Sequence, residues 1–282
     1  MEYTFVSLGR LESFGIRLGG AGLGNILFPW ARALVYAKEN NCRRIQTTWK
    51  NLKIGTFLRM ERDKRLYFDL FTGNDGVSGL KKFWLLNFSN KVRYFKGMDD
   101  LFTPFQTHQT FVKEELLKII NPCHLDNANK FNTNSIAIHI RMGDFENPKN
   151  EQILRDGNWN YRLPIKWYKN IIEQLRKESD LPIFIFSDVE DEDLAEILAL
   201  KDCKRAYFGS AISDMIALSN AKILVSSAST FSMWGSFLGQ MPTIWFPGQL
   251  RQRLINDNNV FEGELDYDDE LPISIKEIIS NG

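Results

Sequence analysis

Cysteine is scarce in this chain of 282 residues. Cys42, Cys123 and Cys203 lie far apart, form no CxxC pair and have no pair of histidines nearby. This spacing matches neither the common zinc motifs nor a framework of disulfides. We therefore expect three buried free thiols and a reducing compartment.

Long apolar runs are also absent. A membrane-spanning helix needs about 18 or more consecutive apolar residues, and no such run occurs. The first twenty residues carry Glu2, Arg10, Glu12 and Arg17, which interrupt any apolar stretch of the kind found in secretory signal peptides. We expect no transmembrane span and a cytoplasmic location, and peripheral association with a membrane stays open.

The chain has no excess of charge of either sign. Its 35 Lys and Arg residues balance its 35 Asp and Glu residues, so there is no general attraction to nucleic acid or to an anionic membrane. Any anion must therefore be held locally. With 44% hydrophobic and 25% charged residues, the composition is that of a globular protein long enough for two domains.

The N-terminal pattern predicts a strand, a glycine-rich turn and a helix. A strand is expected over residues 5–9, a helix over 26–41 and a second strand over 43–49, and glycines occupy positions 19, 20, 22 and 24. This order resembles the opening of a Rossmann-like unit. The glycine turn could cradle a phosphate at the start of the helix, or it could simply be a tight turn.

The second half alternates strand and helix patterns. Strands are expected over residues 135–140, 182–188, 222–228 and 242–247, the last of the chain, and helices over 165–178, 189–200, 213–221 and 229–239. We expect Ser213 or Asp214 to cap the third of these helices. The alternation predicts a doubly wound parallel sheet, and the polar segment 126–135 is the best candidate for a linker.

A polar cluster follows the first of these strands. His139, Arg141 and Asp144 come where a ligand would bind in an open α/β sheet, beyond the carboxyl end of the strand. Arginine offers a planar fork to a phosphate. The same residues could instead form an Arg141–Asp144 structural pair beside a buried, hydrogen-bonded His139, and the residues alone leave both interpretations open.

Two further stretches sit at strand ends. Ser229 and Thr230 follow the strand at 222–228, where they could bind a diphosphate, cap the next helix, or do both. The acidic run at 190–193 could suggest a metal site. We favour the simpler interpretation that these carboxylates open a helix, because acidic residues are stabilised at that end.

Taken together, the motifs resemble one enzyme family. HIRMGD, WYKNIIEQLR, IFIFSD and SDMIALSNAKILVSSASTFSMWGSFL follow one another in the order typical of the α-1,2-fucosyltransferases of glycosyltransferase family 11 and their α-1,6- and protein O-fucosyltransferase relatives. GGAGLGNILFPWARAL is similar to the family's GGLGNQLFQYA opening. The resemblance covers the start and residues 135–247 and says little about 45–130.

The resemblance implies a GT-B fold, in which two Rossmann-like domains face each other across a cleft. Residues 1–130 would bind the acceptor and residues 131–282 the nucleotide sugar. The implied reaction is an inverting transfer of L-fucose from GDP-fucose to a glycan hydroxyl, with neither a metal nor a prosthetic group. The alternatives are a UDP- or GDP-linked hexose or pentose donor, such as galactose or xylose, and a non-catalytic glycan-binding protein.

Motif by motif, the resemblance also implies site residues. Arg141 would grip the donor diphosphate, with His139 and Asp144 shaping the site. The other implied contacts with the nucleotide sugar are Gly22, Gly24, Asn25, Asp214, Ser229, Thr230 and Phe231. Asp69, Asp75 and Glu146 are candidates for a carboxylate base.

The sequence departs from the family pattern HxRRGDY at two positions. Met142 stands for the second arginine and Phe145 for the tyrosine. The loss of one cation puts the identity of the donor in doubt more than the fold. Six aromatic residues could stack on sugar rings or pack in the core: Trp49, Phe57, Tyr67, Phe83, Trp84 and Trp159.

Overall fold

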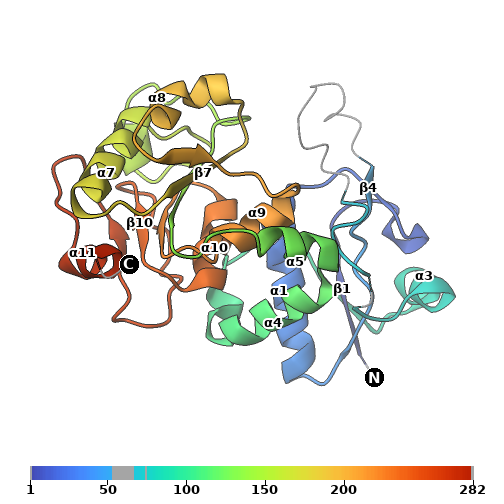
Figure 1. Cartoon of the computed structure of the whole chain (residues 1–282). Coiled ribbons are helices and arrows are strands. Elements are labelled where there is room, and N and C mark those ends of the chain that lie inside the picture. Colours follow the sequence, from blue (N-terminus) through green and yellow to red (C-terminus); the bar gives the residue numbers. More distant parts are fainter. Residues whose placement is uncertain (1, 53–66, 74, 281–282) are drawn as a thin grey trace. The chain divides into compact units, whose positions relative to one another are not determined.

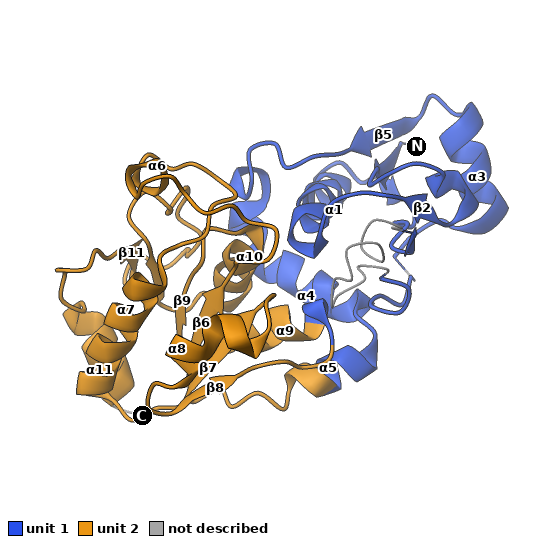
Figure 2. Ribbon diagram, turned by 90° about the horizontal axis from the view of Figure 1, so that it is seen from above, with its two compact units in different colours: residues 1–126, 210–212 blue, residues 127–209, 213–282 orange. Residues whose placement is uncertain are grey.

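The computed structural model describes residues 2–52, 67–73 and 75–280 (Figure 1). Its contacts divide the chain into two compact units (Figure 2). Unit 1 comprises residues 1–126 with 210–212, and unit 2 comprises 127–209 with 213–282. Each unit is a mixed α/β structure built on a parallel sheet.

Unit 1 is built on a three-stranded parallel sheet. β1 (Tyr3–Val6) lies between β3 (Arg43–Arg44) and β5 (Val92–Phe95), and α1 (Leu23–Glu39) packs against β1 and β5. The predicted strand–turn–helix–strand order is thus confirmed. The first strand ends at Val6, so the prediction is wrong for residues 7–9. The helix begins three residues earlier than expected, and the regular part of the second strand is much shorter than 43–49.

The remaining elements of unit 1 are short. They are η1 (Glu12–Phe14), β2 (Arg17–Leu18), β4 (Asn51–Leu52), α3 (Gly79–Phe88), η2 (Thr103–His108), α4 (Gln109–Ile119) and α5 (Pro122–Ala128), the last of which runs across the boundary into unit 2. α5 occupies the first part of the predicted linker 126–135, so that prediction is wrong for residues 126–128. Pro122 explains the helix, because proline suits a first helical turn.

Unit 2 contains a six-stranded parallel sheet in the order β11-β10-β9-β6-β7-β8. The strands are β6 (Ile136–Ile140), β7 (Ile183–Ser187), β8 (Cys203–Arg205), β9 (Ile223–Val225), β10 (Thr243–Trp245) and β11 (Glu262–Glu264). The predicted parallel sheet is confirmed. The prediction that 242–247 is the last strand is wrong, because β11 follows it.

Helices cover both faces of this sheet. They are α6 (Gln152–Arg155), α7 (Ile165–Glu178), η3 (Asp191–Leu194), α8 (Ala195–Leu198), α9 (Ala211–Leu218), α10 (Thr230–Gly239) and α11 (Ile273–Ser280). In both views α7 and α11 lie on one side of the sheet and α9 and α10 on the other (Figures 1 and 2). This is the doubly wound arrangement that the sequence predicts.

The best-predicted helix is α7, whose observed bounds equal the predicted ones. Pro164 precedes its first residue, and the apolar stripe that includes Trp167, Ile171 and Leu175 is buried at helical spacing. The Trp167 indole N–H donates to the Leu265 carbonyl at 2.8 Å, which satisfies its one polar atom. The helix is therefore held by apolar burial and by a bond to the segment after β11.

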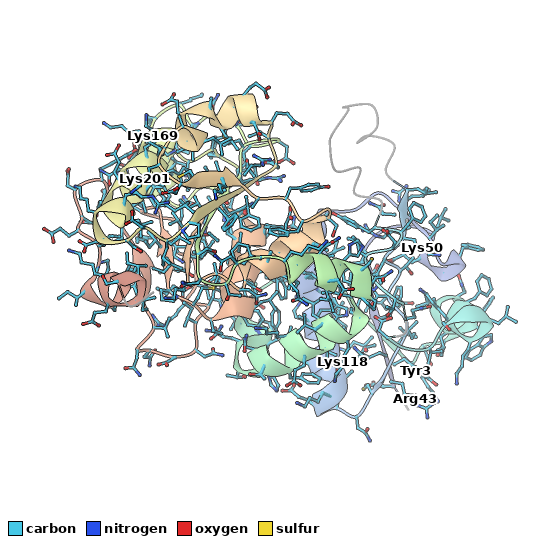
Figure 3. The ribbon with its side chains drawn as sticks, viewed as in Figure 1. Tyr3, Arg43, Lys50, Lys118, Lys169 and Lys201 are labelled. Carbon is cyan, nitrogen blue, oxygen red and sulfur yellow. The ribbon has the colours of Figure 1, made fainter. Side chains whose placement is uncertain are left out.

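Charged side chains cover the outer surface of unit 2. Lys169 pairs with Glu196, and Lys201, with 69% of its side chain exposed, pairs with Asp180 (Figure 3). Exposed pairs of this kind contribute little to stability, because water screens them. They do not determine the fold.

Two local predictions need correction. α9 begins at Ala211, so Ser213 and Asp214 lie inside its first turn and do not cap it. The helix expected over 189–200 is a 3₁₀ turn followed by one short helix, although Asp191 does open it with other acidic residues as expected.

The three cysteines are free thiols, as predicted. Only Cys203 is buried, whereas Cys42 is half-buried and Cys123 is exposed, so the expectation of three buried thiols is wrong. Among the helices of the described ranges, none has the length and apolar character that a bilayer span requires.

Candidate functional site

The order in which the chain adds strands to the sheet of unit 2 reverses between β6 and β9. From β6 the chain adds β7 and β8 on one side, then crosses to β9 and adds β10 and β11 on the other. In open α/β sheets ligands bind beyond the carboxyl ends of the strands at such a switch point. Residues 141–144 follow β6 and residues 226–229 follow β9. Both segments therefore lie at the switch point, beyond the carboxyl ends of these two strands.

His139 joins the two segments directly. Its Nδ1 lies 2.6 Å from Ser232 Oγ and 2.7 Å from Ser227 Oγ, and its ring stacks on Phe231 with centroids 5.0 Å apart. The imidazole is 5% exposed, and burial lowers the pKa of His139 far below its usual range. It is therefore a neutral, hydrogen-bonded group that fixes the loop after β9.

The loop after β9 ends in the start of α10. Ser229 caps this helix, because its side chain accepts a hydrogen bond from the Ser232 N–H at 3.3 Å. The Ser232 hydroxyl in turn accepts from the Ser227 N–H at 3.1 Å. The predicted capping role of Ser229 is confirmed. The positive end of α10 is thereby held beside His139, which is a favourable place for an anion.

Arg141 leaves β6 and is held by two carboxylates. Its guanidinium lies 2.5 Å from Asp144 Oδ1 and 3.0 Å from Asp188 Oδ2, and 5.4 Å from the centroid of the Phe145 ring. The structural pair of Arg141 and Asp144 that the sequence left open is thus present. The Arg141 side chain is 22% exposed, so it still reaches solvent.

Gly143 is needed for the approach of Asp188. A Cβ at position 143 would collide with Asp188 Oδ2. The Asp188 carboxylate also accepts a hydrogen bond from the Met142 N–H at 3.0 Å. The glycine and aspartate of RMGD therefore have different tasks: the glycine admits one carboxylate to Arg141, and Asp144 supplies the other.

Arg162 shapes the loop that carries these residues. Its Nε donates to the carbonyls of Met142 and Phe145, each at 2.8 Å, and its Nη2 donates to the Gly143 carbonyl at 3.3 Å. Sequence reasoning missed Arg162, Asp188, Ser227 and Ser232 as site residues. Asp188 lies in the quoted motif IFIFSD and Ser227 and Ser232 in VSSASTFS, but no local pattern pointed to Arg162.

Asp214 supports a neighbouring loop. Its Oδ1 accepts a hydrogen bond from the Phe208 N–H at 2.6 Å, which ties the segment before α9 to the first turn of that helix. Phe208 packs edge-on against Phe131 and stacks on Phe186 of β7. Asp214 thus has a structural partner in unit 2.

The glycine segment of unit 1 starts a helix. Gly22 is the N-terminal cap of α1, and its carbonyl accepts the N–H groups of Asn25 and Ile26 at 3.1 and 3.2 Å. Gly24 and Asn25 therefore lie in the first turn, not in a loop that precedes the helix. Glycine is required at Gly20, where φ is +110° and a Cβ would meet Arg17.

The three candidate bases differ in their surroundings. Asp69 has 76% of its side chain exposed and lies 3.9 Å from His124 Nε2, whereas Asp75 is buried with Thr47 as a hydrogen-bond partner. Burial raises the pKa of Asp75. Glu146 is exposed, and its backbone pairs with Tyr161 in unit 2. The surroundings of these three carboxylates do not single out one of them as the base.

The aromatic residues that could stack on a sugar differ in their burial. Trp49 and Tyr67 are buried, and Trp49 stacks on Phe71 with centroids 4.1 Å apart, which is core packing. Trp84 is 55% exposed, and Trp159 is half-buried beside Arg251. Phe57 lies outside the described residues.

Known proteins resemble the chain over most of its length. The sequence model of glycosyl transferase family 11 matches residues 33–249. The chain belongs to glycosyl transferase family 11. This family places the switch-point residues in a glycosyltransferase.

Two Escherichia coli relatives of this family 11 protein have described activities. An alpha-1,2-colitosyltransferase is 27% identical over 274 residues, which cover 82% of this chain and 91% of the relative. The O-antigen biosynthesis glycosyltransferase WbnK is 27% identical over 167 residues, or 52% of this chain and 51% of that protein.

One solved structure shows the shared fold of this family 11 protein. A mutant of Arabidopsis thaliana FUT1 in complex with GDP superposes with a TM-score of 0.50 and 12% identity. The superposition covers 87% of this chain and 70% of that one. At this identity the likeness concerns the fold alone, and it agrees with the α/β architecture with parallel sheets.

Replacing Gly143 should act through Asp188 alone. We expect Gly143→Ala to lower the free energy of unfolding by about 1 kcal/mol, because the new Cβ displaces a carboxylate that bonds Arg141 and Met142. In an Asp188→Ala background the same replacement should cost close to nothing. Chemical denaturation of the four proteins measures this double-mutant cycle. Equal costs in both backgrounds would contradict the assignment.

His139 should remain neutral at ordinary pH. Its pKa is lowered in the folded state, whereas in the unfolded chain it returns to about 6.5. The unfolded state therefore takes up a proton first, so His139 lowers stability as pH falls below that value, by at most about 1.4 kcal/mol per pH unit. We expect its imidazole NMR signals not to titrate between about pH 8 and pH 5. A midpoint inside that interval would show that the ring is hydrated.

Proposed function

We propose that this family 11 enzyme transfers L-fucose from GDP-fucose to a hydroxyl of a glycan acceptor, with inversion at the anomeric carbon and without a metal ion. The observation that carries the proposal is the switch point of unit 2. There an arginine, a neutral buried imidazole and a serine-capped helix start share one sheet edge. The GDP in the FUT1 structure supports a GDP-linked donor.

The proposal extends to the domain arrangement. We propose a GT-B enzyme in which residues 1–130 form the acceptor domain and residues 131–282 the nucleotide-sugar domain. Support comes from the parallel sheet in each unit and from the ligand-binding position of the switch point in unit 2. In this arrangement Gly22, Gly24 and Asn25 contact the donor from the acceptor domain.

The proposed chemistry follows from charge. When the bond between the anomeric carbon and the diphosphate breaks, negative charge develops on the departing diphosphate. Arg141 can donate to this charge through N–H groups that its two carboxylates leave available. The first turn of α10, which Ser229 caps and which begins with Thr230 and Phe231, adds the positive end of a helix. These groups are in place before the reaction, so they need little reorganisation.

An acceptor hydroxyl would attack from the face opposite the diphosphate, which inverts the anomeric centre. A carboxylate base would take its proton. Asp69 and Glu146 are exposed enough to meet an acceptor, whereas Asp75 is enclosed by its own unit. Asp69 and Glu146 are therefore better candidates than Asp75.

A second candidate donor carries a different sugar. The colitosyltransferase matches 82% of this chain, and its name indicates transfer of colitose. Met142 stands where the family pattern has a second arginine, which makes a donor other than GDP-fucose a real alternative, including UDP- and GDP-linked hexoses and pentoses.

Donor preference can be measured directly. We expect GDP-fucose and GDP to raise the melting temperature of the protein more than UDP-galactose and UDP-xylose, because a ligand of the native state stabilises it according to its affinity. Transfer to a panel of glycans should then occur with GDP-fucose and persist in EDTA. A larger rise in melting temperature with a UDP-sugar, or transfer only from a UDP-sugar, would mean that GDP-fucose is not the donor.

Arg141 should matter for turnover more than for folding. We expect Arg141→Ala to lower kcat roughly 10²–10³-fold, the usual effect of removing one preorganised donor to a developing negative charge. Lys276→Ala is the matched control, because Lys276 also pairs with two carboxylates, Glu178 and Glu270, but lies on α11. Near-normal turnover of Arg141→Ala would remove Arg141 from the mechanism.

A further inference from the structure

A small pocket adjoins the start of α10. It is lined by Trp159, Ser229, Trp245, Gln249 and Arg251, together with apolar neighbours. Ser229 follows β9 and Trp245 ends β10, so the pocket lies at the carboxyl ends of adjacent parallel strands. It therefore opens beside the candidate site and on the same sheet edge.

One of the residues that line the pocket, Trp245, carries a buried N–H group without a partner among the described residues. Trp245 is 2% exposed, and within the described part of the chain its indole nitrogen has no hydrogen-bond acceptor. Burying such a donor without a partner is costly. The pocket is thus suited to a group that brings acceptor oxygens.

Arg251 brings a positive charge to the same pocket. Its guanidinium lies 4.2 Å from the centroid of the Trp159 ring, and its nearest protein acceptor is Gln249 Oε1 at 3.5 Å. Over the described ranges it has no carboxylate within 4.0 Å. Burial lowers the pKa of Arg251, and no counter-charge offsets this effect.

The loops that carry Arg251 and Trp159 are fixed against each other. Gly248 has a φ of +82°, and a Cβ there would collide with the carbonyl of Arg155, so the two loops touch through their backbones. The Gln249 side chain also donates to the Leu154 carbonyl at 2.5 Å. The guanidinium is therefore held over the indole by a rigid frame and not by an ion pair.

Charge balance indicates what this cation is for. Arg141 is matched by Asp144 and Asp188, so this group of three carries a net charge of −1 and cannot by itself neutralise a diphosphate. Position 142, where the family pattern supplies a second arginine, holds a methionine. Two other arginines lie near this loop, but both donate to backbone carbonyls: Arg162 to those of Met142, Gly143 and Phe145, and Arg205 to those of Ser187 and Val189. A cation beside the start of α10 would therefore add charge that the loop after β6 does not supply there.

We propose that Arg251 is the second cation of the donor site and that it binds the diphosphate of the nucleotide sugar together with Ser229 and the indole N–H of Trp245. The inference rests on the proposed function, because it assigns a further contact to the same ligand. It adds a positively charged subsite that follows β10, not β6.

Binding of diphosphates tests this role. Titration calorimetry with GDP, UDP, GMP and inorganic pyrophosphate would compare wild type with Arg251→Gln and Arg251→Lys. We expect Arg251→Gln to bind pyrophosphate and the preferred nucleoside diphosphate roughly 10- to 100-fold more weakly, which is the value of one charged hydrogen bond. Arg251→Lys should retain part of the affinity. Lys201→Gln removes an exposed cation that precedes the amino end of β8, at the opposite edge of the sheet from the pocket, and should bind like wild type (Figure 3 labels Lys201).

The comparison with GMP separates a direct contact from a structural effect. If Arg251 touches the terminal phosphate, the ratio of GDP to GMP affinity should fall in Arg251→Gln. An equal loss for both nucleotides, or a large drop in melting temperature, would show that Arg251 only supports the fold. Trp245→Phe should weaken diphosphate binding several-fold, and unchanged binding would mean that a buried water is the partner of the indole.

The two proposals can fail separately. If wild type binds a nucleoside diphosphate and Arg251→Gln binds it equally well, the role of Arg251 is wrong and the transferase proposal stands. If wild type binds none of GDP, UDP and pyrophosphate, the donor site itself is wrong and both proposals fall.

Discussion

The hydrogen bonds between His139 and the serines of the β9–α10 loop are the constraint on which the site depends. β6 and β9 are far apart in sequence but adjacent in the sheet, and His139 is the polar side chain by which β6 contacts that loop. A buried imidazole is tolerated only when its nitrogens are satisfied. Ser227 and Ser232 satisfy the Nδ1 atom of His139. The Ser232 hydroxyl also accepts a hydrogen bond from the Ser227 N–H in the loop that leads into α10. One buried cluster thus sets where the helix starts.

The charged part of the site is built on that frame. Arg141 follows His139 by two residues, so its backbone position is set by the same strand. The two carboxylates beside it orient the guanidinium, but they also cancel its charge. An arginine arranged in this way is well positioned to donate hydrogen bonds, but it contributes little net positive charge to the site. Affinity for a highly charged anion must then come from elsewhere, namely from the end of α10 and from cations at neighbouring strand ends.

Much of unit 2 is predictable from the sequence. β6, β7, β9, β10 and α7 have apolar runs or helical stripes strong enough to be found without an alignment, and the Ser229 cap follows from its position after a strand. β8 and β11 were missed because they are three-residue strands with the polar sequences CKR and EGE. Short edge strands are defined by pairing with a neighbour, and local sequence carries little of that information.

The candidate site shows the same division. The pattern identified Arg141, Asp144, His139 and Ser229, which lie within or directly after a strand. It could not assign a task to Asp188, because the contact with Met142 joins residues 46 positions apart and depends on a glycine between them. A contact between residues that follow different strands depends on the three-dimensional arrangement. A sequence motif identifies only one of the two residues in such a contact.

Parallel strands give a physical reason why one motif can change while the site is kept. All their carboxyl ends meet at one edge, so a cation that follows β10 can serve the same ligand as a cation that follows β6. A methionine at position 142 therefore does not by itself lower the positive charge available to a diphosphate, provided that Arg251 has the role proposed for it. In that case, the methionine in place of the second arginine of HxRRGDY would be only weak support for a donor with a nucleotide other than GDP. Donor identity has to be judged from the whole sheet edge, because that edge, and not any single loop, is the unit that the ligand contacts.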